Sequence, residues 1–176
     1  MVTHRTNRLS LRPIVHGDFV AIGMMNSDPH VMRYLCLNSR IPTYSEAFED
    51  ASNMIEWGSQ FGYGPWAITC LVSGTFYGWV GLFCVEGSRD IELGYRLAYP
   101  YWGNGYATEA GRKIVDYAFL DMNIQHLIAL IHPRNHASVR VAVKVGMDFV
   151  KTASICGHAL NQYARSRDSY MFLRGM

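Results

Sequence analysis

The sequence predicts one α/β domain spanning residues 1–176, with a mixed central sheet of about seven strands flanked by helices. Three observations predict this class. Segments in which apolar residues alternate with polar ones are interspersed with segments in which apolar residues recur at helical spacing. A glycine-containing turn near the middle of the chain separates a strand pattern from a helix pattern. With 49% hydrophobic residues, the chain has enough apolar side chains for one full core. The expected order of elements is β-α-α-α-β-β-β-α-β-α-β-β.

The chain begins with a strand pattern followed by short helices. Residues 8–12 alternate between polar and apolar side chains and stop at Pro13, which has no amide to donate to a sheet. Asp18 is placed to cap a short helix that runs to Met25. After a Ser-Asp-Pro step, residues 30–35 carry apolar side chains at helical spacing. One strand and a small helical unit are therefore expected here.

A longer helix and a hairpin come next. Thr43 and Glu46 stand in the relation of a capping box, which predicts a helix over 44–58 that ends at the glycines following it. Residues 65–72 and 76–85 are rich in aromatic and β-branched side chains, and a Ser-Gly-Thr turn separates them. These two runs are expected to form a β-hairpin.

The central unit is a strand, a glycine turn and a helix. Residues 91–97 predict the strand, and the turn after Pro100 opens a helix over about 104–121. A short apolar strand at 126–131 and a helix over 135–145, ended by a glycine, follow. Strands and helices alternate here, which predicts a mixed sheet.

The last third of the chain predicts two further strands, over about 147–155 and 168–173. The segment between them, Gly157 to Arg167, is polar and is expected to be a surface loop. The aromatic run from Ser169 to Leu173 would then form an exposed edge that could pair with a second copy of the chain. A homodimer is therefore one expectation from the sequence.

Charge and cysteine content exclude several classes of protein. The 16 basic and 14 acidic residues give a formal net charge of +2 without a basic or acidic run, so neither nucleic acid nor a membrane surface is an expected partner. No apolar segment approaches the roughly 20 residues that span a bilayer, and the N-terminus has no signal-peptide pattern. The cysteines lack a C-x-x-C spacing and are expected to be buried thiols in a reducing compartment, which indicates the cytoplasm. They are Cys36, Cys70, Cys84 and Cys156.

The turn from Trp102 to Ala107, Trp-Gly-Asn-Gly-Tyr-Ala, is suited to binding an anion. Its glycines let the backbone approach a ligand closely, and the free amides of the first helical turn would face that ligand together with the helix dipole. A phosphate or pyrophosphate is the expected ligand, and tight packing of the backbone is the alternative. A Rossmann turn would need glycine or alanine at Thr108, and a Walker A loop would need Gly-Lys-Ser or Gly-Lys-Thr after the glycines. Neither nucleotide-binding motif fits.

The same stretch resembles motif A of the GCN5-related N-acetyltransferase (GNAT) superfamily, Gln/Arg-x-x-Gly-x-Gly/Ala. Trp102 takes the first position, Gly105 the fourth and Ala107 the sixth, and Trp102 departs from the Gln or Arg of the superfamily. The branch similar to the ribosomal-protein alanine and serine N-acetyltransferases RimJ and RimL commonly reads Tyr-Trp-Gly-x-Gly-Tyr-Ala-Thr-Glu-Ala, which Tyr101 to Ala110 match. Other blocks resemble that branch in the same order. They are Arg8 to Pro13, Asp18, Ser27 to Tyr34, Ile91 to Leu97 and His132 to Val141.

The resemblance implies a GNAT fold with acetyl-coenzyme A as the acetyl donor. Backbone amides of the glycine turn would bind its pyrophosphate, and backbone groups of Tyr95 and Leu97 would pair with the pantetheine arm. Asn135 would lie beside the pantetheine, although its position before a helix pattern is also explained by capping alone. The residues expected at the turn are Gly103, Asn104, Gly105, Tyr106, Ala107 and Thr108.

Three catalytic groups are expected. By resemblance, the backbone amide of Tyr95 would polarise the thioester carbonyl. Glu92 is the acidic side chain inside the same strand, and it could take the proton from the substrate ammonium, directly or through a water. Its alternative role is an ion pair with Arg96 or with the charge of the substrate. Ser138 stands where this branch is expected to place a hydroxyl near the sulfur of coenzyme A, and it could protonate the departing thiolate.

The expected activity is acetyl transfer to a primary amine by direct attack in a ternary complex. The acceptor could be a protein N-terminus or a small amine, and the fold does not choose between them. A noncatalytic domain that binds or senses acyl-coenzyme A is the alternative, against which the polar residues of the expected site argue. No metal is expected, because Pro133 interrupts any helix that would align His132 with His136.

Overall fold

The computed structural model describes residues 1–35, 43–85, 88, 90–155 and 157–175. The chain divides into two compact units, Met1–Gly81 with Tyr95–Ala110 and Leu82–Gly94 with Gly111–Met176. We call them the first and the second unit and describe each by itself. The prediction of an α/β class with a mixed sheet is confirmed, and the prediction of one domain stays a prediction.

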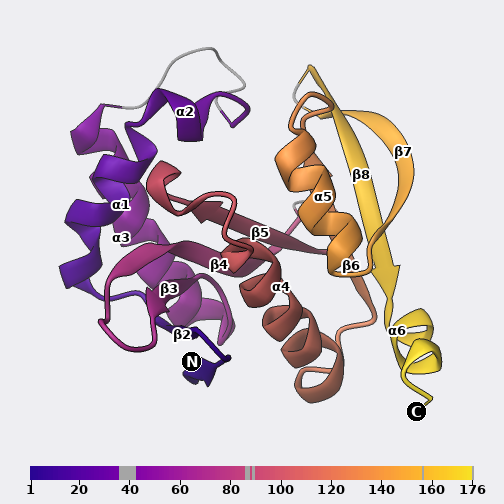
Figure 1. Cartoon of the computed structure of the whole chain (residues 1–176). Coiled ribbons are helices and arrows are strands. Elements are labelled where there is room, and N and C mark those ends of the chain that lie inside the picture. Colours follow the sequence, from indigo (N-terminus) through magenta and orange to yellow (C-terminus); the bar gives the residue numbers. More distant parts are fainter. Residues whose placement is uncertain (36–42, 86–87, 89, 156, 176) are drawn as a thin grey trace. The chain divides into compact units, whose positions relative to one another are not determined.

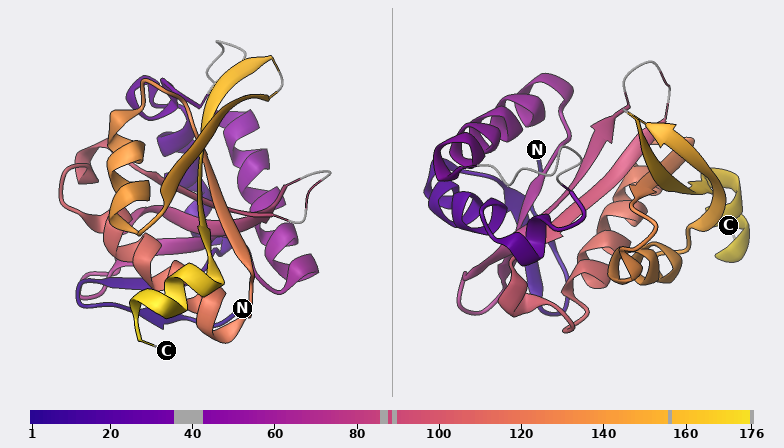
Figure 2. Two further views of the ribbon diagram at one scale, coloured as in Figure 1. Left: turned by 90° about the vertical axis from the view of Figure 1, so that its right-hand side faces the viewer. Right: turned by 90° about the horizontal axis from the view of Figure 1, so that it is seen from above.

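The first unit combines an antiparallel part of the sheet with helices (Figure 1). Its elements are β1 (His4–Arg5), β2 (Leu9–Pro13), η1 (His16–Asp18), α1 (Phe19–Asn26), α2 (Pro29–Met32), α3 (Tyr44–Phe61), β3 (Trp66–Cys70) and η2 (Tyr99–Tyr101), with parts of β4 (Phe76–Cys84), β5 (Ile91–Leu97) and α4 (Tyr106–Asp116). β2 pairs with β3, and β3 with β4, so that Leu11 stands opposite Ile68 and both are fully buried. α1 and α3 pack side by side, as the second view in Figure 2 shows.

The second unit combines a mixed part of the sheet with helices. Its elements are η3, a π-helical turn (Tyr117–Asp121), β6 (His126–Ile131), α5 (His136–Lys144), β7 (Asp148–Ile155), β8 (His158–Ser166) and α6 (Arg167–Leu173), with the remaining parts of β4, β5 and α4. β5 and β6 are parallel, with Glu92 opposite Ile128, whereas β8 is antiparallel to β6 and to β7. β7 and β8 form a long hairpin that leads directly into α6 (Figure 2). Over the described residues, the sheet has the order β1-β2-β3-β4-β5-β6-β8-β7.

Several predicted elements are confirmed together with the interactions that predicted them. The strands at 91–97 and 126–131 have the predicted bounds, as β5 and β6. The capping box is present at the start of α3, where the Glu46 amide donates to Thr43 Oγ1 at 3.3 Å. In return, the Thr43 amide donates to Glu46 Oε2 at 2.8 Å. Both donors would otherwise lack an intrahelical partner.

The role predicted for Asp18 is wrong, although the helix after it exists. Its carboxylate makes no capping bond to α1. Instead it accepts two hydrogen bonds of 2.7 Å from the guanidinium of Arg12, and a third of 2.9 Å from the amide of Val15. A planar guanidinium binds a carboxylate in this bidentate way more strongly than one amide can. Asp18 therefore ties the loop after β2 back to that strand.

Two predictions at the C-terminus are also wrong. Residues 157–167 were expected to be a loop, but His158–Ser166 form β8, and the strand expected over 168–173 is the helix α6. The Ser166 side chain caps this helix by accepting from the Ser169 amide at 3.2 Å. Tyr170 is its only fully buried side chain among those described, since a helix turns the other aromatic and apolar residues of the run outward. The run offers no strand edge to a second copy of the chain.

The cysteines that the structure describes are less buried than expected. Cys70 is half-buried and Cys84 is exposed. Cys36 and Cys156 lie outside the described residues. The prediction that every thiol is buried is therefore wrong for Cys84, because this residue ends β4 and the end of the strand is exposed.

Candidate functional site

The glycine turn joins the end of β5 to the start of α4 within the first unit. Gly103 and Gly105 both have φ of +78°, in the left-handed region that favours glycine. The first helical bond runs from the Glu109 amide to the Gly105 carbonyl at 3.0 Å. The amides of Tyr106, Ala107 and Thr108 therefore precede the ladder of α4, where the positive end of the helix dipole also lies. This is the geometry of an anion-binding helix N-terminus.

Space beside the turn is open on the side of Gly103. A β-carbon added there would meet no atom of the described chain within 4 Å. At Gly105 the nearest atom to such a β-carbon would be Arg8 Nη2, at 3.6 Å. A positive φ at both positions and open space at the first of them fit the close approach of an anionic ligand such as the pyrophosphate of coenzyme A.

Trp102 ties the turn to the end of β5. Its Nε1 donates a hydrogen bond of 2.8 Å to the Leu97 carbonyl. Asn104 tightens the same turn, because its Nδ2 donates to the Trp102 carbonyl at 3.0 Å. Sequence reasoning treated Trp102 only as a mark of resemblance and missed this role. The bond from Trp102 leaves the Leu97 carbonyl oxygen a second lone pair, which is able to accept a bond from a pantetheine arm. That second bond stays a prediction.

β4 comes very close to β5 near the predicted pantetheine site. A β-carbon at Gly78 would lie 2.0 Å from the Arg96 carbonyl oxygen and 2.7 Å from Leu97 Cα, distances that no side chain tolerates. The Ala98 amide also donates to the Tyr77 carbonyl at 2.9 Å. The end of β5, and with it the start of the turn, is therefore held by β4. Sequence reasoning included Gly78 in a strand without this requirement.

Glu92 belongs to the second unit, in the half of β5 that pairs with β6. Burial raises its pKa above the ordinary value, and a hydrogen bond from the backbone amide of Leu130 partly opposes that shift. Arg96, the alternative partner from the sequence, donates to Asn26 Oδ1 at 2.6 Å and lies over the Trp79 ring. A carboxylate with a raised pKa is a better proton acceptor than an exposed one.

Asn135 and Ser138 also belong to the second unit, at the start of α5. The Ser138 amide donates to Asn135 Oδ1 at 3.2 Å, so Asn135 caps this helix. The capping role expected of Asn135 is thereby confirmed. Its second role beside a pantetheine arm, and the role of the Ser138 hydroxyl, stay predictions.

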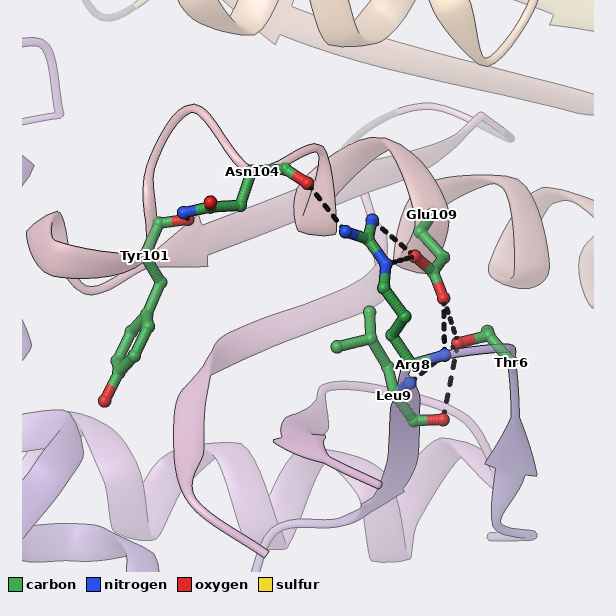
Figure 3. A network of polar contacts seen from close by, with 6 residues as sticks. All are labelled: Thr6, Arg8, Leu9, Tyr101, Asn104 and Glu109. Atoms are coloured by element: carbon green, nitrogen blue, oxygen red, sulfur yellow. Dashed lines mark hydrogen bonds and ion pairs between the residues drawn. The ribbon is translucent and has the colours of Figure 1, made fainter. Parts of the chain in front are cut away.

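A network around the start of α4 was missed by sequence reasoning (Figure 3). Arg8 contacts Glu109 and the Asn104 carbonyl, while Thr6 donates to Glu109. The available signal was a basic residue at the start of the strand predicted over 8–12 and an acidic residue in the first turn of the central helix. Nothing in one sequence relates two residues about a hundred positions apart, because pairing between them depends on the fold.

Two further findings concern ligands and membranes. Among the residues that the structure describes, no three His, Cys, Asp or Glu side chains gather into a group that could hold a metal ion. Likewise, no helix in the described part of the chain combines the length and apolar character needed to cross a membrane.

The fold and the turn define an α/β protein with an anion-binding junction between a sheet strand and a helix. The chain matches the model of the acetyltransferase (GNAT) domain over residues 8–148. It therefore belongs to the GNAT acetyltransferase family, which uses acetyl-coenzyme A for N-acetyl transfer. The match does not separate the branch that resembles RimJ and RimL from the rest of the family, so that branch stays a prediction.

Comparisons with individual proteins agree with this assignment. The chain is 35% identical to the YkkB protein of Bacillus subtilis over 157 residues, which cover 84% of this chain and 86% of that protein. Its fold is similar to that of an acetyltransferase from Agrobacterium tumefaciens, with a TM-score of 0.82, 26% identity and 94% of each chain covered. It is also similar to AAC(6')-Ib, whose structure is a complex with ribostamycin and coenzyme A, with a TM-score of 0.80, 17% identity, and 96% and 98% of the two chains covered.

Proposed function

We propose that this chain transfers an acetyl group from acetyl-coenzyme A to a primary amine, with the turn from Gly103 to Thr108 binding the pyrophosphate. The observation that carries the proposal is this turn, in which two left-handed glycines precede three amides that have no intrahelical acceptor. Two negative charges of a pyrophosphate suit the partial positive charge of the helix end. Family membership supports the identity of the donor.

The residues of this chain supply binding, polarisation and proton transfer. Acetyl-coenzyme A supplies the acetyl group and a thiolate leaving group. The Tyr95 amide donates a hydrogen bond to the thioester oxygen, and such a donor contributes about 3 kcal/mol to transition-state stabilisation when aligned. Glu92 accepts a proton from the acceptor ammonium, which frees the nitrogen lone pair to form the new C–N bond. Ser138 donates a proton to the sulfur as the C–S bond breaks, and its oxygen takes up the second proton that the attacking nitrogen loses as it becomes the amide.

No covalent enzyme intermediate is part of the proposal. Cys70 and Cys84, the thiols that the structure describes, lie on β3 and β4, outside the turn and outside α5. An acceptor that attacks directly must be present together with the donor, so both substrates occupy the enzyme at once. Initial-rate patterns with both substrates varied should therefore intersect, whereas parallel lines would indicate a covalent route.

The acceptor class is proposed as a peptide N-terminus or a small amine. The resemblance to RimJ and RimL makes the first worth testing, and the similarity in fold to AAC(6')-Ib, a protein in complex with ribostamycin, makes the second equally worth testing. The test measures thiol release from acetyl-coenzyme A with peptides bearing N-terminal alanine or serine, with polyamines and with aminoglycosides. Acceptor-dependent release is expected for one of these classes. Tight binding without acceptor-dependent release would favour the noncatalytic acyl-coenzyme A sensor.

A matched pair of glycine variants tests whether the turn binds the donor. Gly105 and Gly74 both have positive φ, +78° and +72°, but Gly74 lies in the hairpin turn between β3 and β4. Alanine at either position costs about 1 kcal/mol of backbone strain. Gly105→Ala should weaken coenzyme A binding about tenfold in calorimetry, because it deforms the amide cradle, and Gly74→Ala should not. Equal affinities in both variants would remove the turn from the site.

A further inference from the structure

Arg8, which immediately precedes β2, contacts the glycine turn and the helix after it (Figure 3). Its Nη1 donates to the Asn104 carbonyl at 3.0 Å. Its Nε donates to Glu109 Oε2 at 2.7 Å, and Nη2 lies 2.6 Å from the same oxygen. The guanidinium also lies over the Tyr106 ring, 4.6 Å from its centroid. One side chain thus contacts the turn, the first residue of α4 and the end of the first helical turn.

Glu109 receives bonds from the same N-terminal segment on its other oxygen. The Thr6 hydroxyl donates to Oε1 at 2.6 Å, and the Arg8 amide donates to it at 3.0 Å. Thr6 is itself fixed, because its Oγ1 accepts from the Leu9 amide at 3.0 Å. Partial burial raises the pKa of Glu109, but the hydrogen bonds from Thr6 and Arg8 outweigh burial and hold it below the ordinary value. Glu109 is therefore ionised at neutral pH.

An ionised carboxylate in the first turn of α4 competes with an anionic ligand for the same positive helix end. Left alone, Glu109 would repel a pyrophosphate bound to the amides of Tyr106, Ala107 and Thr108. Arg8 cancels this charge through its two contacts with Oε2. The bond from Arg8 to the Asn104 carbonyl also fixes the peptide that leads into Gly105. Arg8 therefore both neutralises the charge of Glu109 and orients the turn.

We infer that Arg8 is a positioning residue for donor binding, which neutralises Glu109 and holds the Asn104 carbonyl so that the turn accepts a pyrophosphate. The inference rests on the function proposed above. It assigns a role in cofactor affinity to the segment before β2, which contributes no residue to the predicted motif. Because Arg8 is about half-exposed, with 49% of its side chain accessible, solvent screens part of its effect.

The test uses Arg8→Gln, Glu109→Gln and the double variant, with Arg12→Gln as the matched control. Arg12 also holds a carboxylate with two bonds of 2.7 Å, but its partner is Asp18, a residue of η1 and not of the glycine turn or of α4. Coenzyme A affinity is measured by calorimetry, and acetyl-coenzyme A KM and kcat with the best acceptor. Arg8→Gln should weaken binding about tenfold and raise KM without changing kcat, since a charge-assisted pair is lost and a carboxylate is exposed.

The double variant separates this role from a merely structural one. Removing both charges ends the repulsion, so Arg8→Gln with Glu109→Gln should regain most of the affinity that Arg8→Gln loses. Arg12→Gln should lower the melting temperature but leave coenzyme A affinity unchanged. A double variant as weak as Arg8→Gln, or equal losses in Arg8→Gln and Arg12→Gln, would overturn the inference. If the unmodified chain fails to bind coenzyme A, the proposed function fails instead.

Discussion

Glu92 shows how one buried carboxylate links chemistry to stability. Its pKa is raised by burial, against a hydrogen bond from the Leu130 amide. As a proton acceptor it works only when ionised, so activity should fall as the pH drops through this raised pKa. The same burial makes ionisation costly for the folded state. A substitution at Glu92 should therefore change both the activity and the stability of the protein.

Glu92→Gln should lower kcat about 100-fold or more, because general-base catalysis typically contributes at least that factor. The acidic limb of the pH profile of kcat/KM should disappear in this variant. Steady-state thiol release over a range of pH measures both effects. The control is Glu56→Gln, which changes an exposed carboxylate on α3. Unchanged turnover at neutral pH in Glu92→Gln would remove Glu92 from the mechanism.

The same variant should be more stable than the parent at neutral pH. A carboxylate whose pKa is raised in the folded state stabilises the fold fully at pH values below its ordinary pKa, near 4.5. That contribution is lost as the pH rises through the folded-state pKa. Glutamine keeps a neutral side chain at every pH. The gain in melting temperature should therefore be present at neutral pH and shrink in acid. A gain that does not depend on pH would contradict the buried-charge explanation.

At the scale of the element, local interactions decide which predictions succeed. The capping box of Thr43 and Glu46 is encoded within four residues, and its helix forms as expected. The aromatic run after Ser169 favours a strand by composition, yet it forms α6. A serine cap and the burial of Tyr170 stabilise the helix, and composition does not report either.

The cap of α6 gives a testable energy. Ser166→Ala removes the oxygen that accepts from the Ser169 amide, and it should cost about 1 kcal/mol of unfolding free energy. Urea denaturation measures the change. Ser169→Ala is the matched control, because Ser169 contributes only its amide to the cap and its side chain is exposed. Equal losses in both variants would mean that the cap does not stabilise α6.

Much of the candidate site could be predicted because its residues are close in sequence. The turn from Gly103 to Thr108 is a local pattern, since left-handed φ and free helical amides follow from glycine and helix geometry. The ties that hold the turn could not be predicted. Arg8 reaches Glu109 only because β2 lies near the start of α4, and Gly78 matters only because β5 passes close to it. Such contacts depend on sheet order, which one sequence does not specify.

At the scale of the whole molecule, no linker in the sequence marks the division into two units. The reason is that β4, β5 and α4 each contribute residues to both. A boundary that runs through regular elements leaves no stretch of glycine, proline or polar residues to recognise.

Donor binding should be visible in the stability of the whole chain. Coenzyme A at 100 times its dissociation constant should add about 2.7 kcal/mol to the free energy of unfolding. For a chain of this length, that gain corresponds to a rise of roughly 5–10 °C in melting temperature. Calorimetry or a dye-based melt measures the shift. Gly105→Ala should show a smaller one at the same ligand concentration, and equal shifts would contradict a site at the turn.

Trp102 gives the chain a built-in optical probe. Of the four tryptophans, Trp66 and Trp79 are buried and Trp57 is half-buried on α3, whereas Trp102 is 40% exposed and its indole is anchored to the Leu97 carbonyl beside the glycine turn. A ligand that settles on the turn replaces water around this indole while the buried indoles keep their surroundings. Intrinsic fluorescence should then report cofactor occupancy directly, without label or coupled assay, and Trp102→Phe would silence the signal.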